Sequence, residues 1–190
     1  MHTDVVLVRH ALSVPPTADG PDEFTRPLAR DGLQQALELV ETLTEPRPVA
    51  VWSSPYRRAI QTVEPTARAL GLTVRTRWEL REWDDGLPYT DDWEPHYAQS
   101  WADPRYARPG GESLDHLTVR AVGAVRALAQ ENRGRLVLAA GHGTFIARAL
   151  SGFGVPVDWT FWQRMPMPAV YRLRFADPST NPAVTVAGCR

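Results

Sequence analysis

Short runs rich in Val, Leu and Ala alternate with longer amphipathic segments along most of the chain. Such runs, bounded by charged residues, glycine or proline, are typical of buried strands. The predicted strands cover residues 4–9, 49–53, 74–80, 136–140, 169–175 and 183–186. Apolar positions that recur every three or four residues predict helices instead, at residues 30–43, 57–70, 114–130 and 144–150.

This alternation predicts an α/β fold, a three-layer α/β/α sandwich with a mostly parallel central sheet of about six strands. The last two predicted strands have no helix of comparable length between them, so we expect an antiparallel pair at that edge of the sheet. No linker or internal repeat interrupts the pattern, and we expect residues 1–190 to form one domain.

Residues 83–113 break the pattern, because they are rich in Trp, Asp, Pro and Tyr and too long for a plain loop. We expect an insertion that carries one short helix, at residues 93–101, and covers an active site as a cap. Aromatic residues here and near residue 160 either line the mouth of a pocket or pack against one another, and packing is the commoner role. They are Trp93, Tyr97, Trp101, Trp159 and Trp162. Arg105, Arg108 and Arg164 either bind a second anionic group or are simply solvated.

The composition narrows the classes of function. The 190 residues carry a net charge of -1, with a pI of about 6.5, so nothing favours binding to nucleic acid or to an acidic membrane surface. No apolar run approaches the roughly 20 residues that cross a bilayer, and no secretory signal is visible. The one cysteine, Cys189, cannot form a disulfide within the chain, so we expect a cytoplasmic protein. The chain has no Lys, so phosphate contacts must come from Arg, His or backbone N–H groups.

Two histidines stand where predicted strands end. His10 follows Arg9 after the first apolar run, and His142 stands between Gly141 and Gly143 after the fourth. Because ligands bind at the carboxyl ends of the strands in open α/β sheets, we expect both histidines at one site. Two imidazoles with an adjacent Arg indicate phosphoryl chemistry.

Four motifs carry this candidate chemistry in a fixed order along the chain. They are Arg9-His10-Ala11, the segment from Ser53 to Thr62, Leu80-Arg81-Glu82 followed by Gly86, and Gly141-His142-Gly143. Two weaker segments fit the same order, from Pro27 to Ala36 and from Pro109 to Ser113. Together they resemble the motifs of the histidine phosphatase superfamily, also called the phosphoglycerate-mutase-like superfamily, over essentially the whole chain.

Phosphoryl transfer depends mainly on positioning and electrostatic stabilisation. A neutral imidazole can attack phosphorus and form a covalent phosphohistidine, and the resemblance implies that His10 is this nucleophile. Arg9 and Arg58 suit bidentate recognition of the phosphoryl oxygens, and the family motif selects Arg58 over its neighbour Arg57. We expect His142 to donate to the transferring group or to balance its charge.

Glu82 is the candidate general acid, which protonates the leaving oxygen and then acts as base on the incoming water. This role needs a raised pKa, for which Trp83 and the Trp-rich insertion would supply an apolar setting. Asp84 and Asp85 are competing carboxylates, and the family motif favours Glu82 over both.

Two further residues complete the predicted substrate-binding set. Gly143 would expose N–H groups at the start of a helix, where anions bind readily, and the hydroxyl of Ser13 would hydrogen-bond the phosphate. The chain also departs from the family pattern. Ala11 replaces the commonest Gly, Leu12 a Glu or Gln, Pro16 an Asn and Ala29 a Thr. We therefore expect an active enzyme with an altered substrate pocket.

These features predict a metal-independent phosphomonoester phosphatase that needs no cofactor and acts on a small phosphorylated substrate. Mutase members of the family usually have longer insertions and a closing C-terminal tail, so the modest insertion and the short C-terminal end favour a phosphatase. A mutase and a non-catalytic binder of a phosphorylated ligand remain alternatives, and Glu82 argues against the binder. A metallohydrolase is a third alternative, although no element carries closely spaced histidines.

Overall fold

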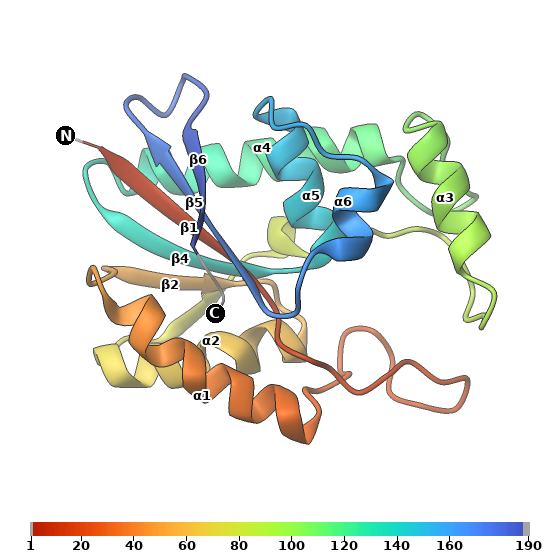
Figure 1. Cartoon of the computed structure of the whole chain (residues 1–190), viewed down its shortest axis with the longest axis horizontal. Helices are drawn as coiled ribbons and strands as arrows, with labels where there is room; N and C mark the ends of the chain where they lie inside the picture. Colours follow the sequence, from red (N-terminus) through yellow and green to blue (C-terminus); the bar gives the residue numbers. More distant parts are fainter. Residues whose placement is uncertain (1, 188–190) are drawn as a thin grey trace.

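The structure is a computed structural model that describes residues 2–187, so Cys189 lies outside the described residues. Within this range the chain forms a six-stranded sheet (Figure 1). Its strands are β1 (Thr3–Arg9), β2 (Ala50–Ser53), β3 (Val74–Thr76), β4 (Leu136–Gly141), β5 (Ala169–Phe175) and β6 (Ala183–Ala187). They lie in the order β3-β2-β4-β1-β5-β6, with parallel pairs from β3 to β1 and antiparallel pairs at β1–β5 and β5–β6. The predicted fold class and the antiparallel edge are confirmed.

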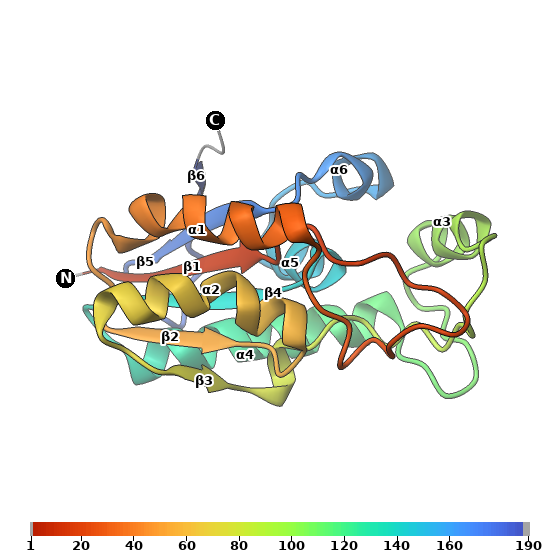
Figure 2. The ribbon, with the colours of Figure 1, turned by 90° about the horizontal axis from the view of Figure 1, so that it is seen from below.

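Four helices cover the two faces of the sheet (Figures 1 and 2). They are α1 (Arg30–Thr44), α2 (Arg57–Leu70), α4 (Leu114–Glu131) and α5 (Gly143–Gly152). Successive side chains of a strand point to opposite faces, and β1 shows both cores. Val5 and Leu7 belong to the core with α4 and α5, and Val6 and Val8 to the core with α1 and α2. A strand that is buried on both faces must be apolar at every position, which explains its unbroken apolar run.

The strand predicted at residues 74–80 is too long. Only Val74–Thr76 is a strand, and it is followed by the 3-10 helix η1 (Trp78–Leu80). β3 is the edge strand and pairs only with the four-residue β2, so β2 limits the length of the ladder. Leu80 is completely buried, and the 3-10 turn brings it from the sheet edge into the core.

The sequence pattern did not predict helix α6 (Trp159–Arg164), which has six residues. Asp158 caps it, because its carboxylate accepts a hydrogen bond of 2.7 Å from the N–H of Phe161. The capping residue was visible in the sequence, but a helix this short has no clear hydrophobic period. None of the helices in the described part of the chain is long and apolar enough to cross a membrane.

The insertion at residues 83–113 carries helix α3 (Glu94–Ala102), one residue later than predicted. Its aromatic residues pack against α6: Trp93 and Tyr97 contact Trp162, and Trp101 contacts Trp159 and Trp162. These five aromatic residues thus pack against one another, which is the role that we expected for most of them. They join the insertion to the C-terminal part of the chain.

The three arginines considered as an anion subsite differ from one another. Arg108 is buried and donates to the backbone carbonyl of His96 and to the hydroxyl of Ser100, so it holds the insertion together. Arg105 and Arg164 are exposed. The structure therefore gives Arg108 a structural role that neither interpretation of the sequence anticipated.

Candidate active site

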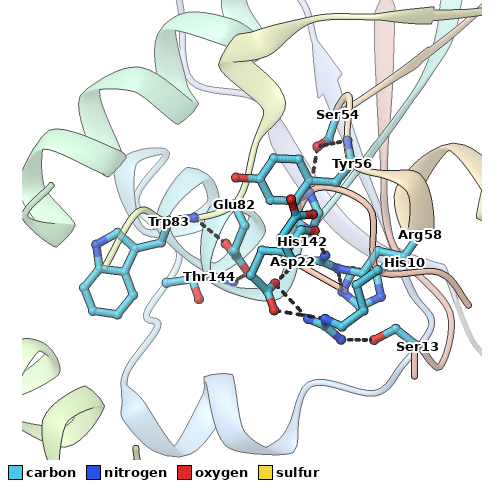
Figure 3. Close-up of polar contacts among 12 residues, drawn as sticks. His10, Ser13, Asp22, Ser54, Tyr56, Arg58, Glu82, Trp83, His142 and Thr144 are labelled. Atoms are coloured by element: carbon cyan, nitrogen blue, oxygen red, sulfur yellow. Dashed lines mark hydrogen bonds and ion pairs between the residues drawn. The ribbon is translucent and has the colours of Figure 1, made fainter. Parts of the chain in front are cut away.

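The candidate site lies at the carboxyl ends of three parallel strands. His10 follows β1, Ser54 follows β2 and His142 follows β4. Because β1 and β4 pair in parallel with Arg9 opposite Gly141, the two histidines leave neighbouring strands at the same level. Their rings are 5.3 Å apart between centroids, with an edge-to-face orientation (Figure 3). The sheet therefore brings together two residues that are 132 positions apart (142 minus 10).

Hydrogen bonds fix the orientation of the His10 ring. Its Nδ1 lies 2.8 Å from the carbonyl oxygen of Ala11, which can only accept, so Nδ1 carries the proton. The lone pair then lies on Nε2, where the Nε–H of Arg58 donates over 3.2 Å. The loop itself is held by the N–H of Ala11, which donates to the Thr62 hydroxyl over 3.0 Å, and by the N–H of Leu12, which donates to Gln35 Oε1 over 3.0 Å. Nε2 thus carries the lone pair, as the predicted role of His10 as a nucleophile requires.

The departures from the family motif after His10 leave this loop intact. No residue other than glycine has a positive φ in the described part of the chain, so Ala11 needs no glycine-like conformation. Gly32 of α1 lies against the carbonyl of Leu12, since a Cβ built at Gly32 would come within 1.9 Å of that oxygen. The helix therefore packs against the loop backbone, and only glycine fits at its point of closest approach.

Both histidines are kept neutral. Burial lowers the pKa of His10 and of His142 well below its usual value, because an imidazolium would lose its hydration. The positive charge of Arg58 lowers both pKa values further. A neutral imidazole at His10 has the lone pair that a nucleophile needs, so the expectation of a persistent neutral form agrees with the electrostatics of the site.

His142 is completely buried, and its ring has one hydrogen-bond contact among the described residues, between Nε2 and the Oγ of Ser54 at 2.8 Å (Figure 3). Ser54 also accepts a hydrogen bond of 3.2 Å from the N–H of Tyr56. If the Ser54 hydroxyl donates to Nε2, the ring proton of His142 is on Nδ1. This Nδ1 is buried without a hydrogen-bond partner among the described residues. A buried donor normally has a partner, so an anionic ligand is the natural one.

Arg58 is only 2% exposed, whereas its neighbour Arg57 is exposed, as the motif predicted. Besides His10, Arg58 contacts Glu23, with Nη1 donating to the backbone carbonyl over 2.5 Å and Nη2 lying 2.9 Å from the carboxylate. The same carboxylate binds Arg26 at 2.8 and 2.9 Å. Arg26 in turn donates to the Ser13 hydroxyl over 2.7 Å. Arg58 and the predicted ligand-binding Ser13 thus belong to one network, whose anion is Glu23.

Sequence reasoning missed Glu23 and Arg26. The sequence did contain a signal for them. Glu23 stands three positions before Arg26, and Arg26 directly precedes the weaker motif that begins at Pro27. Arg26 is 8% exposed, which is rare for Arg without a partner. The ring of Tyr56 was also missed, and it lies 5.1 Å from the Arg58 guanidinium and 4.9 Å from the His142 ring.

Arg9 lies against Gly143, the first residue of α5. Its Nη1 donates to the backbone carbonyl of Met165, and its Nε is buried without a hydrogen-bond partner among the described residues. A Cβ built at Gly143 would lie 3.1 Å from three guanidinium atoms of Arg9. Gly143 therefore makes room for Arg9, a steric role that the sequence did not reveal.

Glu82 accepts hydrogen bonds from three backbone N–H groups. Trp83 donates to Oε1 over 2.9 Å (Figure 3). Phe145 also donates to Oε1 over 2.9 Å, and Thr144 donates to Oε2 over 3.2 Å. Thr144 and Phe145 lie in the first turn of α5, so Glu82 occupies the N–H groups that we expected to bind phosphate. The N–H groups at the start of α5 are thus occupied, and their acceptor is the carboxyl group of Glu82.

Burial raises the pKa of Glu82, and this effect outweighs the three N–H groups and the charge of Arg58, which lower it. Oε2 accepts only one of the three hydrogen bonds and has room for a proton. The competing carboxylates differ from Glu82: Asp84 is exposed, and Asp85 accepts hydrogen bonds from Leu87 and Tyr97 within the insertion. Glu82 has the environment of a general acid.

Among residues 2–187, no three His, Cys, Asp or Glu side chains cluster in a way that could hold a metal ion. The cations of the site are guanidinium groups, of Arg9, Arg26 and Arg58. The arrangement can therefore bind a phosphoryl group, attack it with a neutral imidazole, and protonate a leaving oxygen.

The chain matches the family model of the histidine phosphatase superfamily (branch 1) over residues 5–182. It is 30% identical over 154 residues to a metal-independent phosphoserine phosphatase of Arabidopsis thaliana, covering 74% of this chain. The chain spans about 64% of the length of that relative.

Three solved structures with the same fold are each 24% identical to this chain or less. A mycobacterial glucosyl-3-phosphoglycerate phosphatase has a TM-score of 0.76 and 23% identity, with coverage of 98% of this chain and 97% of that chain. YhfR of Bacillus stearothermophilus has a TM-score of 0.79 and 24% identity, with coverage of 98% and 96%. The phosphoserine phosphatase of Entamoeba histolytica, a mutant in complex with phosphoserine, has a TM-score of 0.75 and 17% identity, with coverage of 96% and 95%. At these identities the likeness concerns the fold.

Proposed function

The chain belongs to the histidine phosphatase superfamily, and we propose that it is a phosphomonoester phosphatase that works through a covalent phosphohistidine. The observation that carries the proposal is the environment of His10. Its ring is neutral, its proton is held on Nδ1 by the Ala11 carbonyl, and its Nε2 faces the guanidinium of Arg58. An imidazole nitrogen that carries no proton and lies beside a cation is what attack on a phosphoryl group requires.

In the first step, Nε2 of His10 forms a bond to phosphorus while the bond from phosphorus to the ester oxygen breaks. Arg58 and Arg9 stabilise the negative charge on the equatorial oxygens, with the unpartnered Nε of Arg9 as one donor. His142 donates from its unpartnered Nδ1. Glu82 gives its proton to the leaving oxygen, so an alcohol departs.

In the second step, water attacks phosphorus and the bond to Nε2 of His10 breaks. Glu82, now a carboxylate, takes a proton from the water, and inorganic phosphate leaves the site. The proton taken from water thus returns Glu82 to its protonated form, which its raised pKa favours. No residue changes its ionisation over the full cycle.

Ser13 and Gly143 contribute to the phosphoryl site in addition to the charged residues. Ser13 accepts from Arg26, so its own hydroxyl hydrogen is available to a phosphoryl oxygen. Gly143 leaves the space in which Arg9 lies over α5. The carboxylate of Glu23 lies against Arg58 and Arg26, where a phosphoryl oxygen would otherwise bind. With three guanidinium groups at the site, we propose that the reaction is metal-independent.

The leaving group belongs to a small metabolite. The relatives and neighbours in the same family include phosphatases of phosphoserine and of glucosyl-3-phosphoglycerate, so we propose a small phosphorylated substrate of this kind. A cytoplasmic location stays a prediction of the sequence.

The test is phosphate release from p-nitrophenyl phosphate, phosphoserine, 3-phosphoglycerate, sugar phosphates and nucleotides, in excess EDTA, by the wild type and by His10→Ala. We expect release that resists EDTA and falls about a thousandfold or more in His10→Ala, because the nucleophile is lost. Retention of more than about a hundredth of the activity would contradict the covalent scheme. Loss of wild-type release in EDTA would indicate a metallohydrolase.

The same panel separates the remaining alternatives. Transfer of phosphate between positions of 3-phosphoglycerate, without release, would indicate a mutase. Binding of a phosphorylated compound without either reaction would indicate a non-catalytic binder.

A further inference from the structure

Two motifs that are about 30 residues apart in the chain lie backbone to backbone beside the site. A Cβ built at Gly111 would come within 2.7 Å of the Gly86 nitrogen and 2.9 Å of the Asp84 carbonyl oxygen. The N–H of Glu112 donates to that carbonyl over 2.7 Å. The contact leaves no room for a side chain, which explains the glycine at position 111 in the weaker motif.

Arg120 of α4 and Glu112 of the weaker motif form an ion pair that contacts the segment containing Glu82. Arg120 of α4 donates through Nη1 to the backbone carbonyls of Glu79 and Arg81, over 2.9 Å each, and through Nη2 to that of Glu82 over 3.2 Å. Its Nε and Nη2 also bind both carboxylate oxygens of Glu112. Both side chains are largely buried, with exposed fractions of 12% for Arg120 and 15% for Glu112.

Glu112 contacts the other two residues of the same segment. Its backbone carbonyl accepts a hydrogen bond of 2.7 Å from Nε1 of Trp83, and its carboxylate accepts one of 3.3 Å from the N–H of Asp84. Every residue from Arg81 to Asp84 therefore forms a hydrogen bond with Arg120 or with Glu112. We call this pair with its backbone contacts the Arg120–Glu112 clamp.

We propose that Arg120 and Glu112 are positioning residues for the general acid Glu82, an inference that rests on the proposed function. The Glu82 carboxylate touches neither of them, because its own partners are the N–H groups of Trp83, Thr144 and Phe145. The clamp holds the backbone of Glu82 from one side while α5 holds its carboxylate from the other. A displacement of about 1 Å at a reacting group can cost a hundredfold in rate, so this support has a kinetic consequence.

The test uses the dependence of the rate on the leaving group, which a loss of stability alone would not alter. An alkyl phosphate needs protonation of its leaving oxygen, whereas p-nitrophenyl phosphate needs little. Arg120→Lys keeps the charge but cannot bind three carbonyls and a carboxylate at once. Glu112→Gln keeps the shape of the other partner and serves as an independent variant.

Arg126 supplies the matched control, because it also lies on α4 and also binds backbone carbonyls. It donates to Pro178 and Thr180 over 2.7 and 2.9 Å, far from Glu82 in the chain. Arg126→Lys therefore tests whether the loss of such contacts from α4 has a general effect. Thermal unfolding of all variants records the stability that each one loses.

We expect Arg120→Lys and Glu112→Gln to lower kcat/KM for the best alkyl phosphate about tenfold or more, and for p-nitrophenyl phosphate less than about threefold. In a Glu82→Gln background Arg120→Lys should no longer change the ratio of the two rates, because the acid it positions is gone. An equal fall for both substrates, or the same selective fall in Arg126→Lys, would overturn the inference and leave the proposed function standing. Failure of the wild type to hydrolyse any ester would overturn both.

Discussion

The two halves of the candidate site are built differently. The phosphoryl half is made of Arg9, His10, Arg26, Arg58 and His142. Arg58 of α2 donates to His10, and the rings of His10 and His142 lie edge to face at the strand ends. Arg26, in the loop before α1, is joined to Arg58 through Glu23. The acid half consists of Glu82 and the groups that hold it, which are backbone N–H groups and the Arg120–Glu112 clamp. Burial and the charge of Arg58 lower the pKa of His142 in the first half, whereas burial raises the pKa of Glu82 in the second.

The difference shows how one pocket can favour a neutral imidazole beside a carboxyl group whose pKa is raised. Burial favours the neutral form of every group, so it lowers the pKa of His10 and raises that of Glu82. The nearby charge of Arg58 acts in the same direction as burial at His10 and against it at Glu82. The two halves should therefore respond in different ways to substitution and to pH.

Of the changes proposed here, removal of the Arg58 guanidinium should have the largest effect on activity. We expect Arg58→Ala to lower kcat about a thousandfold for every leaving group, because the charge on the transferring group is common to all substrates. Arg58→Lys should restore little, since an ammonium cannot bind His10 and a phosphoryl oxygen in the same geometry. The measurement is steady-state phosphate release, with thermal unfolding to detect loss of the buried contacts.

Arg57→Ala is the matched control, because Arg57 is the exposed neighbour on the same helix. We expect its activity to stay within about twofold of the wild type. A similar loss in both variants would mean that the charge of α2, and not the position of Arg58, supports the reaction.

Substitution of the acid should affect only some substrates. We expect Glu82→Gln to lower kcat/KM about a hundredfold for alkyl phosphates and less than about fivefold for p-nitrophenyl phosphate, which needs little protonation. The expected range follows the usual contribution of general acid catalysis. Equal losses on both substrates would assign the acid role elsewhere, with Asp84 as the next carboxylate in the segment.

The smallest effect should be the pH dependence of stability, in which the two halves have opposite signs. Below about pH 6.5 the unfolded chain binds protons at His10 and His142 that the folded protein excludes, so the unfolding free energy falls as the pH falls. The raised pKa of Glu82 acts the other way. Its contribution to stability is fully present below the usual glutamate pKa of 4.5 and is lost as the pH rises through the pKa of the folded protein.

Denaturant titrations of the wild type and of His142→Asn between pH 5 and pH 8 measure these slopes. We expect the variant to lose up to about 1.4 kcal/mol per pH unit of the slope below pH 6.5, the value for one proton. An unchanged slope would mean that His142 takes up a proton in the folded protein. Glu82→Gln should instead remove the fall in stability at higher pH.

Most of the fold could be predicted from the sequence, because its signals are local. The apolar run of β1 marks a strand buried on both faces, and the predicted bounds of α2 and β5 agree with the structure. Predictions of elements failed where strand pairing or the short length of a helix, and not the local sequence pattern, set the bounds of the element. β3 ended early because its partner β2 is short, and α6 has too few residues for a visible period.

The phosphoryl half was also more accessible to sequence reasoning than the acid half. Arg9, His10 and His142 each adjoin an apolar strand, and parallel pairing brings strand ends to the same edge of a sheet. Glu82 could be selected only through the family motif, since Asp84 and Asp85 lie in the same polar segment. What distinguishes them is which carboxylate reaches the first turn of α5.

The sequence by itself thus determined the layers and the strand ends, because periodicity and strand boundaries depend on neighbours in the chain. The family motif selected the candidate site residues. Only the tertiary structure decided their partners. It placed Glu23 between Arg26 and Arg58, gave the N–H groups of α5 to Glu82, and brought Arg120 to the backbone carbonyl of Glu82. The physical reason is that hydrogen bonds and ion pairs between distant segments depend on how close folding brings the backbones, which local patterns do not encode.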